Sequence, residues 1–158
     1  LIFASFLRTL IGVGGACLAA FILFNFQFPQ VGLGFLLFFI NLLIMGWALG
    51  LAICALLIRF GLSAETLAWA ALFFIQPLCG VFYPITVLPE WLQPLSLVIP
   101  ATYIFEGMRL AYFDGVFDMF LLLKAFLINI VYMIGGISFL LLSYSYARNH
   151  GLLLGNGE

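Results

Sequence analysis

The sequence predicts an all-α integral membrane protein with four transmembrane helices and a re-entrant helical hairpin between the third and the fourth. Hydrophobic residues make up 66% of the chain and charged residues 7%, whereas soluble domains carry roughly a quarter charged residues. Four apolar stretches approach or exceed the length of about 20 residues that a helix needs to cross the hydrocarbon core of a membrane. A fifth stretch is too apolar to be a solvated loop and is rich in proline, and it predicts the hairpin.

The four predicted spans are separated by short connections that contain polar residues or proline. In chain order, the spans cover about residues 2–26, 31–58, 66–88 and 119–147. The second span carries no charged residue and is followed directly by Arg59. The Gly-rich tail, residues 148–158, is expected to be loose.

The chain begins at Leu1 within an apolar stretch, without a charged region or a cleavage-like site. We therefore predict no signal peptide. We interpret the sequence instead as the C-terminal part of a longer protein.

The arginine and lysine residues predict the orientation of the spans. With four alternating spans, Arg8, Arg59 and Arg148 share one side, and Arg109 and Lys124 belong to the other. The side that contains Arg59 has three cations and the other side has two, so we predict that the Arg59 side is cytoplasmic. The C-terminus lies on the same side. Lys124 lies about one turn inside the fourth span and is expected to extend back to the outer interface.

Small and amide residues within the spans predict contacts between helices. The small residues are Gly46 and Gly50 in the second span and Gly135 and Gly136 in the fourth. The second glycine pair is also expected to break the fourth span. Asn41 and Asn129 each stand alone in an apolar span, and each is expected to hydrogen-bond a neighbouring helix.

The proline-rich stretch runs from Gln76 to Arg109 and holds five of the six prolines of the chain. Its uncharged part, Trp91 to Phe105, contains 15 residues, which is roughly 22 Å of helix and too short for a crossing. Pro100 disfavours helix at Ile99, so two short helices are predicted, near 90–98 and 101–113. Non-helical backbone at membrane depth must be covered by protein or water. A re-entrant hairpin over about residues 90–113 meets that requirement.

The side chains of this stretch suit a membrane interface. Tyr83, Trp91 and Tyr103 have the amphipathic rings that settle at headgroup level. Glu106 and Arg109 are spaced i, i+3 on the second short helix and are expected to pair. The pair has two interpretations, a local ion pair that steadies the outer face or a contact for an exported polar substrate.

The proline-rich stretch resembles the signature region of permease subunits of ATP-binding-cassette exporters of the second type. Three motifs carry the resemblance over roughly 35 residues, namely a small residue followed by Gly-x-Phe-Tyr-Pro, Leu-Pro-x-Trp, and aromatic-x-x-Glu-x-x-Arg. They lie at Cys79–Pro84, Leu88–Trp91 and Tyr103–Arg109. Cys79 stands where serine is more usual in that family.

The resemblance implies a six-span half-transporter of which the four spans here are the third to sixth. It implies three partners, a second permease copy, an ABC ATPase subunit or domain, and the lipid bilayer of a bacterial or archaeal plasma membrane. The chain has no GxxxxGK[ST] loop, so ATP and Mg²⁺ are expected on the ATPase and no cofactor in this chain. The residues proposed for an outer gate or substrate path are Tyr83, Trp91, Tyr103, Glu106 and Arg109.

Two other functions are compatible with the composition. A membrane-embedded lipid-modifying enzyme would use acids such as Glu106, Asp114 and Asp118, but the only histidine, His150, is expected on the opposite side. A membrane assembly subunit without transport is the other alternative. The formal net charge of -1 argues against a nucleic-acid partner. No catalytic residue set or metal-binding spacing is recognised in the sequence.

Overall fold

A computed structural model of the chain describes residues 7–8, 11–15, 18–19, 22–23, 28–61 and 63–150. All regular structure in this part of the chain is helical, which confirms the all-α class. The chain divides into two compact units, Leu1–Leu33 and Gly34–Glu158. Most of the predicted first span, 2–26, lies outside the described residues, as does the predicted tail beyond His150.

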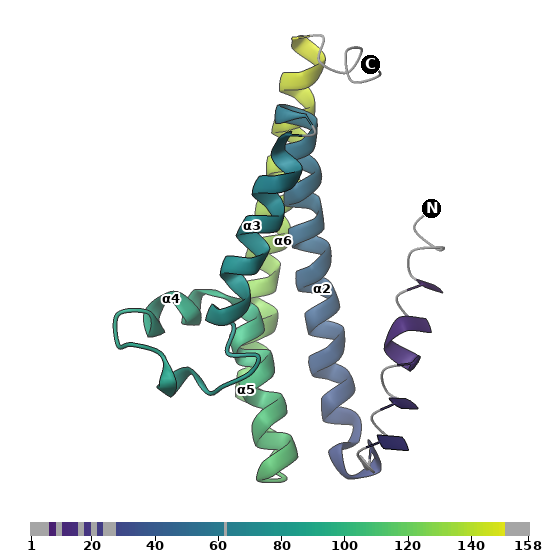
Figure 1. Cartoon of the computed structure of the whole chain (residues 1–158), viewed down its shortest axis with the longest axis vertical. Coiled ribbons are helices and arrows are strands. Elements are labelled where there is room, and N and C mark those ends of the chain that lie inside the picture. The colour runs from purple at the N-terminus through teal and green to yellow at the C-terminus, as the bar shows by residue number, and fades with distance from the viewer. Residues whose placement is uncertain are drawn as a thin grey trace. The chain divides into compact units, whose positions relative to one another are not determined.

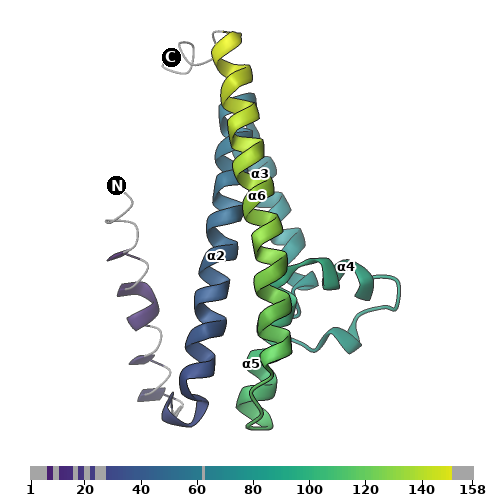
Figure 2. The same ribbon diagram turned by 180° about the vertical axis from the view of Figure 1, so that it is seen from behind.

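The second unit is built from long helices and a short helical insertion (Figure 1). Its elements are α2 (Phe28–Phe60), which enters the unit at Gly34, α3 (Ser63–Leu78), η1 (Ile85–Val87), α4 (Gln93–Val98), α5 (Pro100–Phe113) and α6 (Met119–Asn149). Figures 1 and 2 show α2, α3 and α6 side by side, with α5 along one end of α6 and α4 projecting to the side. The insertion between α3 and α6 is therefore the part of the unit that departs from a simple bundle.

Two helical segments in the described part of the chain are long and apolar enough to cross a membrane. They are Gly34–Phe60 and Met119–Asn149, with mean hydropathies of 2.3 and 2.2. α6 is continuous through Gly135 and Gly136, so the expectation that these glycines break the fourth span was wrong. A glycine within a helix costs about 1 kcal/mol relative to alanine, which a long apolar helix tolerates.

Within the insertion, the helices begin and end at residues that favour a helix boundary. Ile99 adopts an extended conformation, with φ -89° and ψ 123°, between α4 and α5, at the position that Pro100 predicts. Gly115, with a φ of +65°, lies in the turn that follows α5. Asp118 then caps α6, because its Oδ1 accepts hydrogen bonds from the backbone N–H groups of Phe120 (2.8 Å) and Leu121 (3.3 Å).

α2 and α6 are joined by a buried amide pair and a close backbone approach. Asn129 Nδ2 donates hydrogen bonds to Oδ1 of Asn41 (2.7 Å) and to its backbone oxygen (2.9 Å). The prediction that these two amides bond a neighbouring helix is therefore confirmed, and they bond each other. Gly136 lies against the carbonyl group of Ala48, where an added Cβ would come within 2.8 Å of the oxygen.

Two apolar clusters hold the insertion against the long helices. Phe38, Ile104, Leu122 and Ala125 are buried together and join α2, α5 and α6. Gly107 on α5 lies directly against the Phe38 ring and leaves no room for a Cβ there. The second cluster contains Met45, Cys79, Ile99 and Ala101, and it joins α2 to the end of α3 and to the break between α4 and α5.

The glycine pair of α6 offers a matched test of this packing. We expect Gly136→Ala to lower the free energy of unfolding by about 1–3 kcal/mol, the usual cost of overpacking, because the new methyl group meets backbone that cannot rotate away. Gly135→Ala is the control, since nothing lies within 4 Å of a Cβ at that position. Its expected effect is neutral or stabilising by up to about 1 kcal/mol. Unfolding of the purified chain in detergent measures both, and equal stability of the two variants would contradict the packing described.

Candidate functional site

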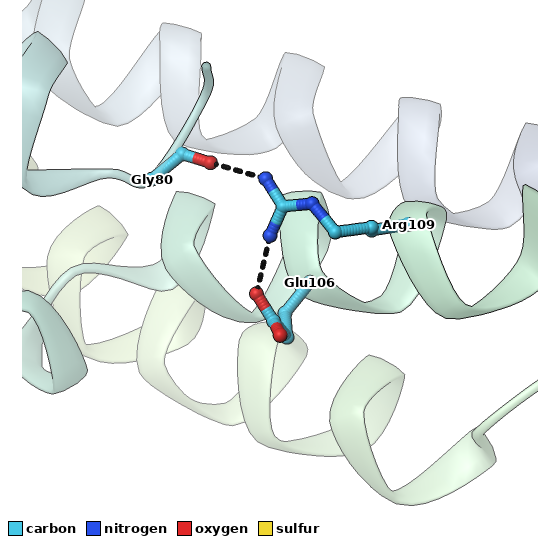
Figure 3. Close-up of polar contacts among 3 residues, drawn as sticks. All are labelled: Gly80, Glu106 and Arg109. Carbon is cyan, nitrogen blue, oxygen red and sulfur yellow. Dashed lines mark hydrogen bonds and ion pairs between the residues drawn. The ribbon is translucent and has the colours of Figure 1, made fainter. Parts of the chain in front are cut away.

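Arg109 on α5 connects two segments that are far apart in the sequence (Figure 3). Its Nη1 lies 2.6 Å from Oε2 of Glu106, one turn earlier on the same helix. Its Nη2 donates a hydrogen bond of 2.9 Å to the backbone oxygen of Gly80, just beyond the end of α3. The predicted pairing of Glu106 with Arg109 is confirmed, and the contact with Gly80 is new.

Gly80 presents this carbonyl because of the way α3 ends. The last four carbonyl groups of a helix have no partner within it, and glycine in the left-handed conformation commonly follows the last turn. Gly80 has a φ of +64°, and a Cβ there would lie 3.1 Å from the backbone oxygen of Tyr83. Any other residue would be strained at this position. The turn thus depends on glycine, and its carbonyl is bound by Arg109.

Two tyrosines of the predicted site also bind backbone carbonyl groups. The hydroxyl group of Tyr83 donates to the oxygen of Pro77 in the last turn of α3 (2.8 Å). The hydroxyl group of Tyr103, on α5, donates to the oxygen of Leu97 near the end of α4 (2.9 Å). Side chains of this segment therefore satisfy acceptors that the short or ending helices leave open.

The five predicted residues do not converge on one point. Arg109 joins Glu106 to Gly80, Tyr83 bonds Pro77 in the last turn of α3, and Tyr103 bonds Leu97 near the junction of α4 and α5. Trp91, in the turn before α4, is 71% exposed. The backbone oxygens of Gly80, Pro77 and Leu97 were not predicted as acceptors. Every residue type possesses a backbone oxygen, so only the glycine in the Gly-x-Phe-Tyr-Pro motif gave a signal.

The site is electrically balanced and partly exposed. The side chains of Arg109 and Glu106 are 23% and 32% exposed, and each neutralises the other. In the described ranges, no group of three or more His, Cys, Asp or Glu side chains is placed to hold a metal ion. Asp118 is engaged as the cap of α6, and His150 stacks on Tyr146 at the opposite end of that helix. The arrangement is suited to holding or releasing segments of backbone, and to contact with polar groups.

Comparison with known proteins identifies a family that matches most of the chain. The family described as ABC-2 type transporter matches residues 1–113. The matched region includes α2 to α5 and every residue of the site from Gly80 to Arg109, and it ends before α6. No curated protein and no solved structure matches the chain.

The fork of Arg109 predicts a difference between two conservative variants. Lysine carries the same charge but is a point charge without the planar fork, so Arg109→Lys should keep at most one of the two contacts. A hydrogen bond to a charged group is worth about 1.5–3 kcal/mol. We therefore expect amide hydrogen exchange in residues 79–92 to rise about tenfold in Arg109→Lys, and further in Arg109→Gln.

Arg148→Gln is the control for this measurement, because Arg148 is exposed in the last turn of α6. In Arg148→Gln, amide hydrogen exchange in residues 79–92 should be the same as in the unmodified chain. Unchanged exchange in both Arg109 variants would show that the fork does not hold this segment.

Proposed function

Since the chain belongs to the ABC-2 type transporter family, we propose that it is the permease of an ATP-driven exporter that moves its substrate outward across the membrane. The observation that carries the proposal is the family match over residues 1–113. The matched region contains the complete bridge of Gly80, Glu106 and Arg109. The bridge gives that region a contact that a conformational change could make or break.

The proposed arrangement in the membrane has spans at about 2–26, 31–58, 66–88 and 119–147, with a re-entrant hairpin at about 90–113. In the third span the α-helix ends at Leu78, and the rest of the span is largely non-helical backbone. α4 has 6 residues and α5 has 14, and both fall short of the roughly 20 that a crossing needs. Tyr103 binds one open carbonyl group of α4, that of Leu97, and Tyr83 and Arg109 bind those of Pro77 and Gly80 at the end of α3. Such internal satisfaction is what backbone at membrane depth requires, and it supports a hairpin that enters and returns.

The proposed partners are an ABC ATPase and a second copy of the permease. ATP and Mg²⁺ would be bound on the ATPase, and this chain would hold no cofactor. We place the complex in the plasma membrane of a bacterium or archaeon, with the C-terminus of the chain in the cytoplasm. The excess of arginine at Arg8, Arg59 and Arg148 supports this orientation.

The proposed outer gate is the junction between the end of α3 and α5. Arg109 holds Gly80 through one hydrogen bond, so a movement of α3 away from α5 must exchange that bond for another partner. Glu106 keeps the guanidinium oriented while this happens. Tyr83 and Tyr103 stiffen the two backbone turns beside the gate, and Trp91 lies exposed at the edge of the hairpin.

Co-purification and export assays test the proposal together. The chain should co-purify with an ATP-hydrolysing subunit or domain from its native membrane. Vesicles reconstituted with the complex should show ATP-dependent outward transport. Glu106→Ala and Arg109→Ala should lower export about tenfold at normal protein levels, the effect of losing roughly 1.4 kcal/mol of interaction.

Glu90→Ala serves as the matched control, because Glu90 is an exposed carboxylate in the same segment. It should export at the rate of the unmodified chain. Undiminished export by both Ala variants of the bridge would refute the gating role. Absence of any ATPase from the purified complex would contradict the exporter assignment itself.

A further inference from the structure

Lys124 is the single lysine of the chain, and it lies half-buried near the beginning of α6. Its Nζ is 4.4 Å from the centroid of the Phe120 ring and 5.8 Å from that of the Tyr103 ring. Both distances are within the range of a cation–π interaction. The ammonium group is thus held between a ring of its own helix and a ring of α5.

The ammonium group has no carboxylate partner in the described part of the chain. The one ion pair found there joins Glu106 to Arg109. Asp118, the acid nearest in sequence, accepts hydrogen bonds from the first N–H groups of α6. An ammonium group has three N–H donors, and aromatic faces attract its charge without accepting conventional hydrogen bonds from all three.

The position of Lys124 within an apolar helix also favours an anion as its partner. Ionisable residues within membrane-spanning segments are costly and are seldom left unpaired. The surroundings of Lys124 therefore favour a negatively charged group brought from outside the described residues.

The surface next to Lys124 defines the rest of the ligand. Phe120, Lys124, Leu127 and Val131 are spaced i, i+4, i+7 and i+11, which places them on one face of α6. The three apolar side chains of this face are exposed. A cation beside an exposed apolar stripe is complementary to an amphipathic anion.

We propose that Lys124, together with Tyr103 and Phe120, binds the phosphate group of a membrane phospholipid whose acyl chain lies along the stripe of Phe120, Leu127 and Val131. The phosphate oxygens would accept charge-assisted hydrogen bonds from the ammonium group. This site is independent of the proposed export function, because it requires only that α6 is exposed to lipid.

The test measures lipid binding to the purified full chain in detergent by native mass spectrometry, with phosphatidylglycerol as the probe. Lys124→Gln should lower the affinity about tenfold, the factor that corresponds to about 1.4 kcal/mol and to one hydrogen bond to a charged group. Lys124→Arg keeps the charge and should retain most of the affinity. Arg148→Gln removes a cation from the other end of α6 and should leave binding unchanged.

Competition identifies the source of the phosphate. A neutral diacylglycerol should bind at least about tenfold more weakly than phosphatidylglycerol, and millimolar inorganic phosphate should not displace the lipid. If Arg148→Gln lost as much lipid affinity as Lys124→Gln, the loss would reflect the overall charge of the chain and not a site at Lys124. That result would overturn the proposal. Displacement by inorganic phosphate, or equal binding of the neutral lipid, would overturn it as well.

A second readout does not depend on the stability of the Gln variant. Reductive ¹³C-methylation of the unmodified chain labels Lys124 as its only side-chain amine. The NMR signal of this dimethylammonium group should shift saturably with phosphatidylglycerol. A signal that does not respond to the lipid would overturn the proposal even if every variant folds poorly.

Discussion

The hydrogen bond from Arg109 to the Gly80 carbonyl is the contact on which the insertion between α3 and α6 depends. α3 ends at Leu78, and the backbone that follows is largely non-helical up to α4 at Gln93. In an apolar environment each open backbone group costs several kcal/mol if it lacks a partner. Arg109 supplies a charged donor for this turn from a distant helix, and Glu106 holds the guanidinium in place.

The apolar packing puts Arg109 within reach of Gly80. Gly107 lies two residues before Arg109 and allows α5 to lie directly against Phe38 of α2. Cys79, next to Gly80, is buried with Met45 of α2 and with Ile99 and Ala101 at the start of α5. The end of α3 and the beginning of α5 are therefore held against the same helix, and the polar bridge forms across the remaining gap.

The two kinds of contact differ in how readily they could rearrange. α2 and α6 meet through the backbone at Gly136 and through the pair of Asn41 and Asn129, and all three residues are buried. The bridge at Arg109 is partly exposed, so water can replace the Gly80 carbonyl. Movement at the junction of α3 and α5 is accordingly less costly than movement between α2 and α6.

Composition and proline positions predicted much of this architecture. They did not predict which residues contact each other between helices. Pro100 marked the break at Ile99, and the i, i+3 spacing marked the pairing of Glu106 with Arg109. Asn129 was recognised as a helix-contacting amide, but sequence alone could not name Asn41 as its partner. Hydropathy extends the third span to Leu88 whereas the helix ends at Leu78, because apolar composition does not distinguish helical from non-helical backbone. The bond to Gly80 was missed because a backbone acceptor leaves no residue-type signal.

The most direct test of the account is the sidedness of the two ends of the insertion. Val87 and Val116 are exposed and flank the segment that contains α4 and α5. Each would be replaced by cysteine, with Cys17, Cys54 and Cys79 changed to serine, and treated with a membrane-impermeant maleimide in sealed, oriented vesicles. If the segment enters the membrane and returns, Val87→Cys and Val116→Cys will react from the same side. Reaction from opposite sides would show that the segment crosses the membrane and would contradict the account.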